Sequence, residues 1–229
     1  MSKTIYLDPG HGGLDAGAVN GKRYEKNDNL KLAKAVKDKL VVQGHIVLMT
    51  REEDVNPTLE ARIAAANIAG ADIFVSLHRN SFTNATAKGI EIWVRYQNHA
   101  AAAAAVLEEL AKVPHQSNRG VKIGVYRVLY NAPMPAMLLE LGFISNDKDN
   151  ELYDKYFDDN ATAIAKGILA ALGEAWEEAG KEAEPEAKPF YRVQVGAFSI
   201  KENAENFLKT VQDMGLPAFL VSPETPKGE

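Results

Sequence analysis

Short apolar runs alternate with longer amphipathic stretches over most of the chain. Residues 72–77 read Asp-Ile-Phe-Val-Ser-Leu, a nearly continuous apolar run that is typical of a strand buried on both faces of a sheet. Residues 29–42 instead carry apolar side chains at helical spacing and stop just before Gly44, which favours an amphipathic helix. The same reasoning predicts strands at residues 4–7, 45–50, 72–77, 89–95, 125–129 and 136–141, and helices at residues 29–42, 58–69, 100–111 and 157–178. This alternation predicts an α/β fold, with a mostly parallel twisted sheet flanked by helices.

The composition changes near residue 174. Residues 174–189 contain six acidic and two basic residues together with alanine and proline, so we expect a solvated acidic linker there. Beyond it, a strand (191–197), a helix (200–214) and a second strand (217–221) are predicted to form a small βαβ-like half-module. The predicted organisation is a large domain over residues 1–175, a linker over 176–189 and a small module over 190–229.

The overall composition is that of a globular protein able to bury a core, with 46% hydrophobic and 25% charged residues. The net charge of −5 has the wrong sign for a polyanion-binding surface, so we expect no nucleic-acid partner. The absence of cysteine excludes disulfides, thiolate metal sites and cysteine nucleophiles. No apolar stretch approaches the ~18–20 residues of a membrane span, and the first residues lack the pattern of a signal peptide. We therefore expect a protein made in the cytoplasm without a signal peptide.

A glycine-rich loop follows the first predicted strand, with the sequence Asp8-Pro9-Gly10-His11-Gly12-Gly13. It is not a dinucleotide fingerprint, because Asp15 stands at the sixth position, and no Gly-Lys-Ser/Thr follows to make a P-loop. What distinguishes the loop is a histidine between glycines at the carboxyl end of a strand, where α/β proteins place ligands. The small neighbours leave this imidazole accessible and let a substrate approach closely.

His78 directly follows the buried run 72–77 and is therefore expected at the same edge of the sheet as His11. Two converging imidazoles suit a divalent metal such as zinc. Because thiolates are absent, a third ligand must be a carboxylate or another histidine. Glu25, just before the helix at 29–42, is the best candidate, with Asp15 and Asp28 as alternatives. The other histidines show no such convergence, and we expect structural roles for them: His45, His99 and His115.

Glu140 is a carboxylate inside the apolar run 137–143. Desolvation raises the pKa of a buried carboxyl and a nearby cation lowers it, which is how an acid/base group is tuned towards neutrality. A buried salt bridge is the alternative interpretation. Each candidate has a structural explanation when taken singly, but together they favour a metal hydrolase.

Four stretches at these residues resemble, in order, the zinc-dependent N-acetylmuramoyl-L-alanine amidases, the type-three cell-wall amidase family. They are Leu7-Asp8-Pro9-Gly10-His11-Gly12-Gly13, Glu25-Lys26-Asn27-Asp28-Asn29-Leu30, Ser76-Leu77-His78-Arg79-Asn80-Ser81 and Leu139-Glu140-Leu141-Gly142-Phe143-Ile144-Ser145-Asn146. The resemblance covers about residues 3–175. It implies a zinc amidase fold with one Zn²⁺ held by His11, Glu25 and His78, and it selects Glu25 over its acidic neighbours. It also implies Glu140 as the catalytic carboxylate.

The reaction implied by the resemblance is hydrolysis of the amide between N-acetylmuramic acid and L-alanine of peptidoglycan. Zinc would lower the pKa of a bound water to roughly 7, and Glu140 would take its proton and pass it to the departing amine. Asp8 is a candidate for orienting the imidazoles, with an anchor of the turn as its alternative. Arg79 stands where the family usually has a small or apolar residue, and we expect its side chain to point outward rather than into the cleft. The rival functions are a non-catalytic peptidoglycan-binding protein and a zinc peptidase that cuts within the stem peptide.

The C-terminal segment resembles the start of a SPOR peptidoglycan-binding module. The matching residues are Phe190-Tyr191-Arg192-Val193-Gln194-Val195-Gly196-Ala197-Phe198-Ser199 and Asn203-Ala204-Glu205. The segment supplies about half of such a module, so we expect peptidoglycan as a partner and a monomer, or a dimer formed through the half-module. We also expect the enzyme to act on the cell wall after lysis or holin-type release, as an autolysin or an endolysin.

Overall fold

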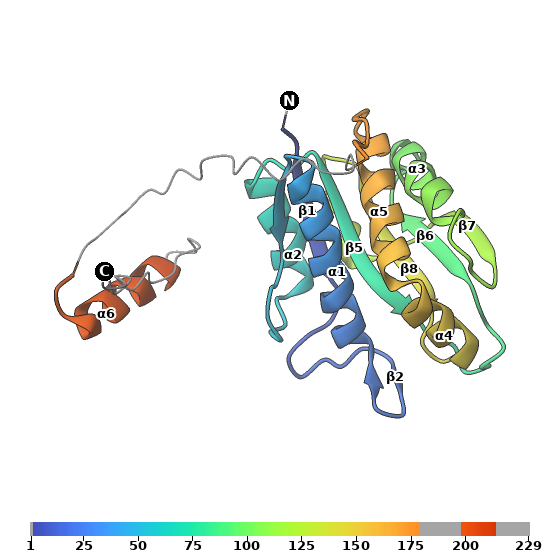
Figure 1. Cartoon of the computed structure of the whole chain (residues 1–229), viewed down its shortest axis with the longest axis horizontal. Helices are drawn as coiled ribbons and strands as arrows, with labels where there is room; N and C mark the ends of the chain where they lie inside the picture. Colours follow the sequence, from blue (N-terminus) through green and yellow to red (C-terminus); the bar gives the residue numbers. More distant parts are fainter. Residues whose placement is uncertain (1, 179–197, 214–229) are drawn as a thin grey trace, which may run out of the picture. The chain divides into compact units, whose positions relative to one another are not determined.

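The computed structural model describes residues 2–178 and 198–213, and the chain divides into two compact units, Met1–Glu178 and Ala179–Glu229. The larger unit is built on a six-stranded sheet with the order β4-β1-β5-β8-β6-β7 (Figure 1). The strands are β1 (Thr4–Pro9), β4 (Ile46–Met49), β5 (Ile73–Asn80), β6 (Ile90–Val94), β7 (Asn118–Ile123) and β8 (Ala136–Phe143). All neighbouring strands run parallel except β6 and β8, so the predicted α/β fold with a mostly parallel sheet is confirmed.

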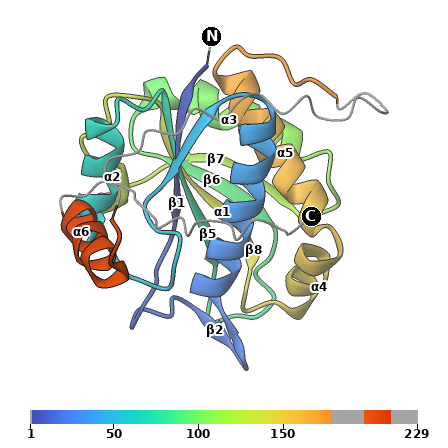
Figure 2. The same ribbon diagram turned by 60° about the vertical axis from the view of Figure 1, so that its left-hand side comes forward.

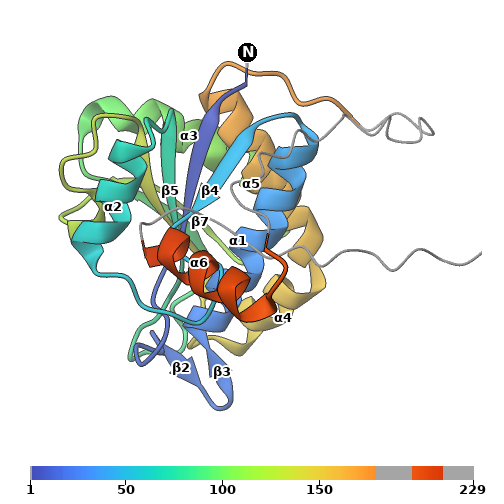
Figure 3. The ribbon, with the colours of Figure 1, turned by 90° about the vertical axis from the view of Figure 1, so that its left-hand side faces the viewer.

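Helices cover both faces of the sheet, but unequally. Helices α1 (Glu25–Val42), α3 (Ala100–Leu110) and α5 (Phe157–Ala171) pack on one face, and the larger hydrophobic cluster lies beneath them. On the other face, α2 (Leu59–Ile68) and the short 3₁₀ helix η2 (Arg127–Leu129) cover a smaller cluster. Figures 2 and 3 show α2 on one side of the strands and α1 and α5 on the other. The smaller hydrophobic cluster does not extend over the whole of the sheet face that α2 covers.

The alternation of side chains along the strands makes this remaining area polar. In β8, Leu139 and Leu141 belong to the cluster under α1, α3 and α5, whereas Leu138 belongs to the cluster under α2. Successive strand residues point to opposite faces, so Glu140 shares the α2 face with Leu138. The antiparallel pairing of β6 with β8 then places Glu91 directly opposite Glu140. The carboxyl end of β8 and the facing start of β6 thus carry one acidic residue each, beyond the apolar part of this face.

Three predicted boundaries differ from the structure near the candidate site and at the last helix. Strand β5 continues to Asn80, so His78 lies inside the strand rather than after it. Helix α1 begins at Glu25, four residues before the predicted start, and acidic residues in its first turn suit the positive end of the helix dipole. The last predicted helix, 157–178, ends at Ala171 because Gly173 adopts a φ of +71° and closes it.

The strand predicted at residues 125–129 is wrong. Val128 and Leu129 instead form one 3₁₀ turn that fills the cluster under α2. The edge strand is β7, which the pattern did not predict because it reads Asn-Arg-Gly-Val-Lys-Ile without apolar alternation. Four other elements were not predicted. They are α4 (Asp147–Lys155), a strongly polar helix, the 3₁₀ helix η1 (Gln97–His99), and the two short strands β2 (Val19–Asn20) and β3 (Arg23–Tyr24) of a hairpin.

The second unit is described through one helix, α6 (Lys201–Asp213), which lies within the predicted helix 200–214. The rings of Phe198 and Phe207 pack together there, with centroids 5.3 Å apart. The strands predicted at 191–197 and 217–221, and most of the predicted linker, lie outside the described residues. None of the helices in the described part of the chain is both long and apolar enough to cross a membrane.

Candidate metal centre

The loop that carries His11 has an unusual backbone. His11 adopts a φ of +60°, and the following Gly12 and Gly13 adopt φ values of +135° and +53°. Residues other than glycine rarely adopt a positive φ, so the backbone of His11 is held in this conformation by its surroundings. A Cβ at Gly12 would lie 2.0 Å from the carbonyl oxygen of Val55, and one at Gly10 would lie 2.2 Å from the ring of His78. The glycines are therefore required by close packing against the site.

Two buried arginines, Arg51 and Arg62, hold this loop by its carbonyl groups. Arg51 donates to the carbonyl oxygens of Pro9 and Gly10, both at 2.9 Å. Arg62 donates to the carbonyl oxygens of Pro9 and His11, both also at 2.9 Å. Sequence reasoning missed both arginines, because nothing in the local pattern shows that residues from distant segments fold under the loop.

Asp8 anchors the loop and does not orient an imidazole. Its carboxylate accepts hydrogen bonds from Arg62 at 2.7 Å, from the Thr50 hydroxyl at 2.6 Å and from the Ser76 hydroxyl at 2.7 Å. This arrangement corresponds to the alternative role considered for Asp8, an anchor of the turn.

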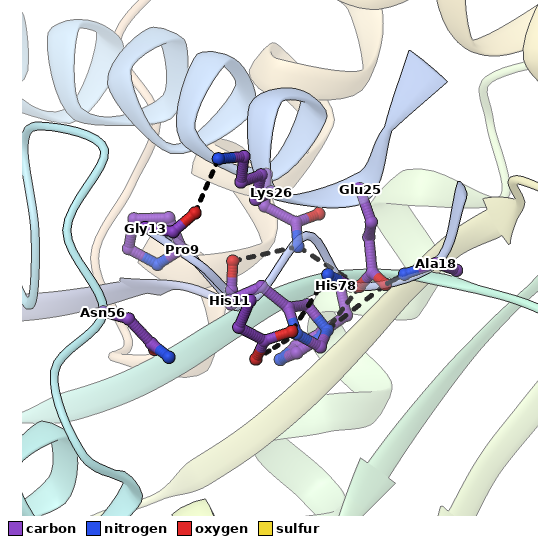
Figure 4. Close-up of polar contacts among 12 residues, drawn as sticks. Pro9, His11, Gly13, Ala18, Glu25, Lys26, Asn56 and His78 are labelled. Atoms are coloured by element: carbon purple, nitrogen blue, oxygen red, sulfur yellow. Dashed lines mark hydrogen bonds and ion pairs between the residues drawn. The ribbon is translucent and has the colours of Figure 1, made fainter. Parts of the chain in front are cut away.

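Glu25 is the first residue of α1, and its buried carboxylate lies between the two histidines. Oε1 is 2.9 Å from Nδ1 of His78, and Oε2 is 3.2 Å from Nε2 of His11. Figure 4 shows these three side chains pointing toward one another. The backbone N–H groups of Ala18 and Arg79 also donate to the carboxylate, at 2.9 and 3.1 Å. Burial alone would raise the pKa of Glu25, but the hydrogen bonds and charges of the two histidines outweigh it and hold the pKa far below its usual value.

Ligand atoms of His11, Glu25 and His78 all lie within 4.8 Å of one another, and they form the one such group among the described residues. Two imidazoles and a carboxylate are a donor set that zinc accepts. In a tetrahedral zinc site with bonds of about 2.0–2.1 Å, neighbouring ligand atoms are about 3.3 Å apart. The 2.9 and 3.2 Å nitrogen–oxygen distances are close to this spacing. The residues present therefore fit one zinc ion.

The two alternative acidic ligands are both engaged elsewhere. Asp15 lies 2.9 Å from Nδ1 of His11, the ring nitrogen that faces away from Glu25. Asp28 pairs with Arg23 and Arg79, at 2.7 Å each. Burial lowers the pKa of His11, but hydrogen bonds and charges from Glu25 and Asp15 raise it above its ordinary value. Asp15 is thus placed to orient the imidazole.

Glu140 lies beside this group without belonging to it. It pairs in register with His78 on the neighbouring strand β5. Its Oε2 atom is buried and has no hydrogen-bond partner in the described residues. Burial, together with the negative charges of Glu25 and Glu91, raises the pKa of Glu140 well above its ordinary value, and Arg79 offsets this only in part. The described residues provide no salt bridge to Glu140, so the alternative interpretation as a buried salt bridge is not supported.

The prediction that Arg79 points outward is wrong. Its side chain is fully buried on the opposite face of β5 from His78, because neighbouring strand residues alternate. It donates to Asp28 and Asn150, both at 2.7 Å, and its guanidinium lies 4.1 Å from the centre of the Tyr153 ring. The Arg79 side chain therefore stabilises the packing of β5 against α1 and α4, and reaches neither solvent nor the cleft.

The three remaining histidines lie apart from the candidate metal ligands. Nδ1 of His45 accepts a hydrogen bond from the Lys3 N–H, and Nδ1 of His99 accepts one from the Ala136 N–H. Burial lowers the pKa of both His99 and His115. None of the three joins a metal-binding group in the part of the chain that the structure describes.

Residues 5–172 match the protein family described as N-acetylmuramoyl-L-alanine amidase. The chain belongs to this family. The amidase is 38% identical to the uncharacterized protein YqiI of Bacillus subtilis (strain 168), over 72% of this chain and 83% of that protein. It is 35% identical to the germination-specific N-acetylmuramoyl-L-alanine amidase of the same organism, over 73% and 78% of the two chains.

A solved structure supports the same assignment. The catalytic domain of CwlV, an N-acetylmuramoyl-L-alanine amidase from Bacillus (Paenibacillus) polymyxa var. colistinus, superposes with a TM-score of 0.72 and 34% identity. The match covers 75% of this chain and 98% of that domain. The amidase is therefore a peptidoglycan hydrolase that cleaves the amide bond between N-acetylmuramic acid and L-alanine. These matches favour the amidase over the two rival functions, a non-catalytic binding protein and a stem-peptide peptidase.

Residues 160–227 match the SPOR domain family. The match begins inside α5, where Ile164 and Ile168 are buried in the core of the larger unit. Only the part from Ala179 onward belongs to the second unit. The predicted resemblance to part of a SPOR module is confirmed, and it indicates peptidoglycan as a binding partner of the amidase.

Proposed function

We propose that the amidase works with a single zinc ion held by His11, Glu25 and His78, and with Glu140 as its acid/base group. The observation that carries the proposal is the convergence of two imidazoles and one carboxylate within 4.8 Å, next to a buried, unpaired carboxyl. Zinc bound there would supply Lewis acidity, which polarises a carbonyl oxygen and lowers the pKa of water to about 7.

The chemistry of the donors supports zinc over calcium and magnesium. Calcium and magnesium prefer sites built from oxygen ligands. Imidazole nitrogen is a good ligand for zinc, and two of the three donors here are imidazoles. The depressed pKa of Glu25 keeps its carboxylate ionised at neutral pH, so it carries a full negative charge towards the cation.

The protein's own residues would handle the proton. Glu140, in its desolvated position opposite His78, accepts a proton from the attacking water and then donates it to the departing amine of L-alanine. A carboxyl with a raised pKa suits both halves of this exchange, because it is basic enough to accept a proton from water and acidic enough to give it to the amine. His11 and His78 stay in place because the glycine loop and strand β5 fix their backbones.

The test compares the wild-type amidase with Glu140→Gln and His78→Ala. We expect a chelator to abolish cleavage of muropeptides and added Zn²⁺ to restore it. Glu140→Gln should bind one zinc per chain but lose about 10²–10⁴-fold in kcat, whereas His78→Ala should lose the metal as well. Elemental analysis measures the metal, and mass spectrometry of the products detects new L-alanine amino termini.

A matched control is Glu60→Gln, which changes an exposed carboxylate that pairs with Arg127 away from the site. It should retain zinc and activity. Full activity of Glu140→Gln would contradict the acid/base role, and undiminished zinc binding by His78→Ala would contradict the ligand set. The oligomeric state and the route by which the amidase reaches the wall stay predictions.

A further inference from the structure

A cavity of about 510 Å³ borders the candidate centre on the β6–β7 side. Glu91, which lines it, is the residue paired across the sheet with Glu140, and Asn80 lines it from the end of β5. Tyr126 forms another part of the wall; burial and the charges of Glu140 and Glu91 raise its pKa to about 12. The cavity therefore begins next to the acid/base carboxyl and extends away from the metal ligands.

Glu91 organises the polar side chains of this cavity. Its Oε1 accepts hydrogen bonds from Asn80 at 2.9 Å and from the Trp93 indole at 3.0 Å. Its Oε2 accepts from Arg119 at 2.6 Å and from Lys122 at 2.5 Å. Burial would raise the pKa of Glu91, but hydrogen bonds from Lys122, Arg119 and Trp93 lower it, so the carboxylate stays ionised. A buried anion thus fixes the positions of two cations and an indole.

The cavity carries one surplus positive charge. Arg119 and Lys122 together bring two, and Glu91 cancels one. The anion is only 3% exposed, whereas the side chains of Arg119 and Lys122 are 36% and 31% exposed. Arg119 uses Nε for Glu91, and its two terminal nitrogens have no hydrogen-bond partner in the described part of the chain. A ligand in the cavity therefore meets the cations rather than the carboxylate.

An aromatic wall accompanies these cations. The rings of Trp93 and Tyr126 lie 5.3 Å apart, and the Lys122 ammonium is 5.0 Å from the centre of the Trp93 ring. Phe82, on the loop before β6, is 60% exposed at the rim. Apolar walls with a few placed polar groups are typical of sites that bind small organic ligands such as a short peptide.

Two other cavities in the described part of the chain differ from this one in both charge and place. One of about 420 Å³ lies between α2 and η2, where Glu60 and Arg127 neutralise each other. Another of about 270 Å³ lies between α3 and α5. It has equal numbers of acidic and basic residues, namely Glu109, Asp159, Lys112 and Lys166. Neither is lined by a residue paired with Glu140.

We propose that the cavity over β6 and β7 is the stem-peptide subsite, and that Arg119 and Lys122 select stems with a free carboxylate on the residue after L-alanine. The proposal rests on the function proposed above, because Glu140 and the metal ligands place the scissile amide at the edge of this cavity. The leaving side of that amide is the peptide, so the peptide must extend into a neighbouring depression. Glu91 acts as a positioning residue, since it holds the two cations and touches no substrate.

The test uses two muramoyl tetrapeptides that differ only in whether the carboxylate after L-alanine is free or amidated. Wild-type amidase should have a kcat/KM about fivefold to tenfold higher for the free acid, which is the size expected for a partly exposed charged contact. Lys122→Met and Arg119→Gln should each bring this ratio close to one, mainly through KM for the free acid. Arg119→Lys, which keeps the charge, should retain most of the preference.

Lys112→Met is the matched control, because it removes an exposed lysine that pairs with Glu109 on α3. It should leave the ratio unchanged. A variant that merely loosens β7 would slow both substrates alike, so an unchanged ratio in Lys122→Met and Arg119→Gln would overturn the subsite. Equal cleavage of both substrates by the wild type would overturn it too. Failure of the function proposed above is distinguishable, because it appears as chelator-resistant cleavage or as an active Glu140→Gln enzyme.

Discussion

At the scale of single residues, the two nitrogens of His11 have different tasks. Nε2 faces Glu25 at 3.2 Å, and Nδ1 faces Asp15 at 2.9 Å. A carboxylate on the second nitrogen of a metal-binding imidazole fixes the tautomer and the ring orientation and makes the ligand more basic. Asp15 also accepts a hydrogen bond from the Gly17 N–H at 3.0 Å, so its own position is set by the loop.

Asp15→Ala should therefore weaken zinc binding by about 10–100-fold without changing the ligand set. Activity should fall steeply at limiting zinc and recover in large part at saturating zinc. A competition titration against a chelator measures the affinity directly. Asp38→Ala, an exposed substitution on α1, serves as the control. An Asp15→Ala protein with wild-type zinc affinity would show that His11 needs no orienting carboxylate.

The positions of His11, His78 and Glu140 could be predicted because each stands in or just after an apolar strand. Spacing could not choose among Glu25, Asp15 and Asp28. The choice depends on where loops fold back: Asp15 lies on the far side of the His11 ring, and Asp28 faces two arginines. The supporting arginines under the loop could not be predicted for the same reason.

At the scale of the elements, the alternation of side chains along β5 places a site residue on one face of the strand and a packing residue on the other. His78 points into the site, and Arg79 points to the opposite face, where it joins Asp28 of α1 and Tyr153 of α4. The sequence contained this information, because a strand that directs residue 78 to one face must direct residue 79 to the other. Because β5 continues through His78 to Asn80, this alternation turns Arg79 away from the site and into the protein.

The buried ion pair between Arg79 and Asp28 predicts that substitutions of its two members lower the free energy of unfolding by unequal amounts. Asp28→Ala removes the partner of a fully buried guanidinium and should lower the free energy of unfolding by about 3–5 kcal/mol. Arg79→Met keeps an apolar stem near Tyr153 and leaves Asp28 paired with Arg23, so its cost should be clearly smaller. Denaturant titrations measure both.

Glu52→Ala is the control for this pair of substitutions, because it breaks an exposed pair with Lys37 and should cost less than about 1 kcal/mol. Similar losses for Asp28→Ala and Arg79→Met would contradict the argument that an uncompensated buried charge is the main cost.

The elements that could be predicted are those with a strong apolar period. Strand β7 and helix α4 were not predicted because polar contacts, rather than apolar faces, hold them in place. Strand β7 lies at the sheet edge and sends Arg119 and Lys122 to Glu91. Helix α4 begins with a cap in which the Asn146 side chain accepts from the Asp149 N–H, and Asp149 in turn accepts from the Phe143 N–H. The partner of β7 lies on another strand, and the contacts of α4 lie within six residues of each other, so neither leaves a periodic apolar signal.

At the scale of the whole molecule, the acidic excess gathers around the boundary between the two units, and the two units match different families. Residues 1–173 carry twenty basic and twenty acidic residues, whereas residues 174–189 carry a clear acidic excess. The amidase family match lies within the larger unit, and the part of the SPOR match beyond α5 lies in the smaller one. The hydrophobic core, the candidate metal centre and the proposed peptide subsite all belong to Met1–Glu178.

This division predicts that residues 1–178 fold without the second unit and cleave a soluble muropeptide with a kcat/KM within about twofold of the full chain, because no catalytic group is lost. Binding to insoluble peptidoglycan should weaken by at least about tenfold, since a second attachment raises the effective concentration of the first. Co-sedimentation with cell walls measures binding, and the full chain carrying Glu140→Gln should still sediment. If the shortened amidase bound walls as tightly as the full chain, the catalytic unit alone would account for attachment. If it lost activity on the soluble substrate, the second unit would contribute to folding or to the site itself.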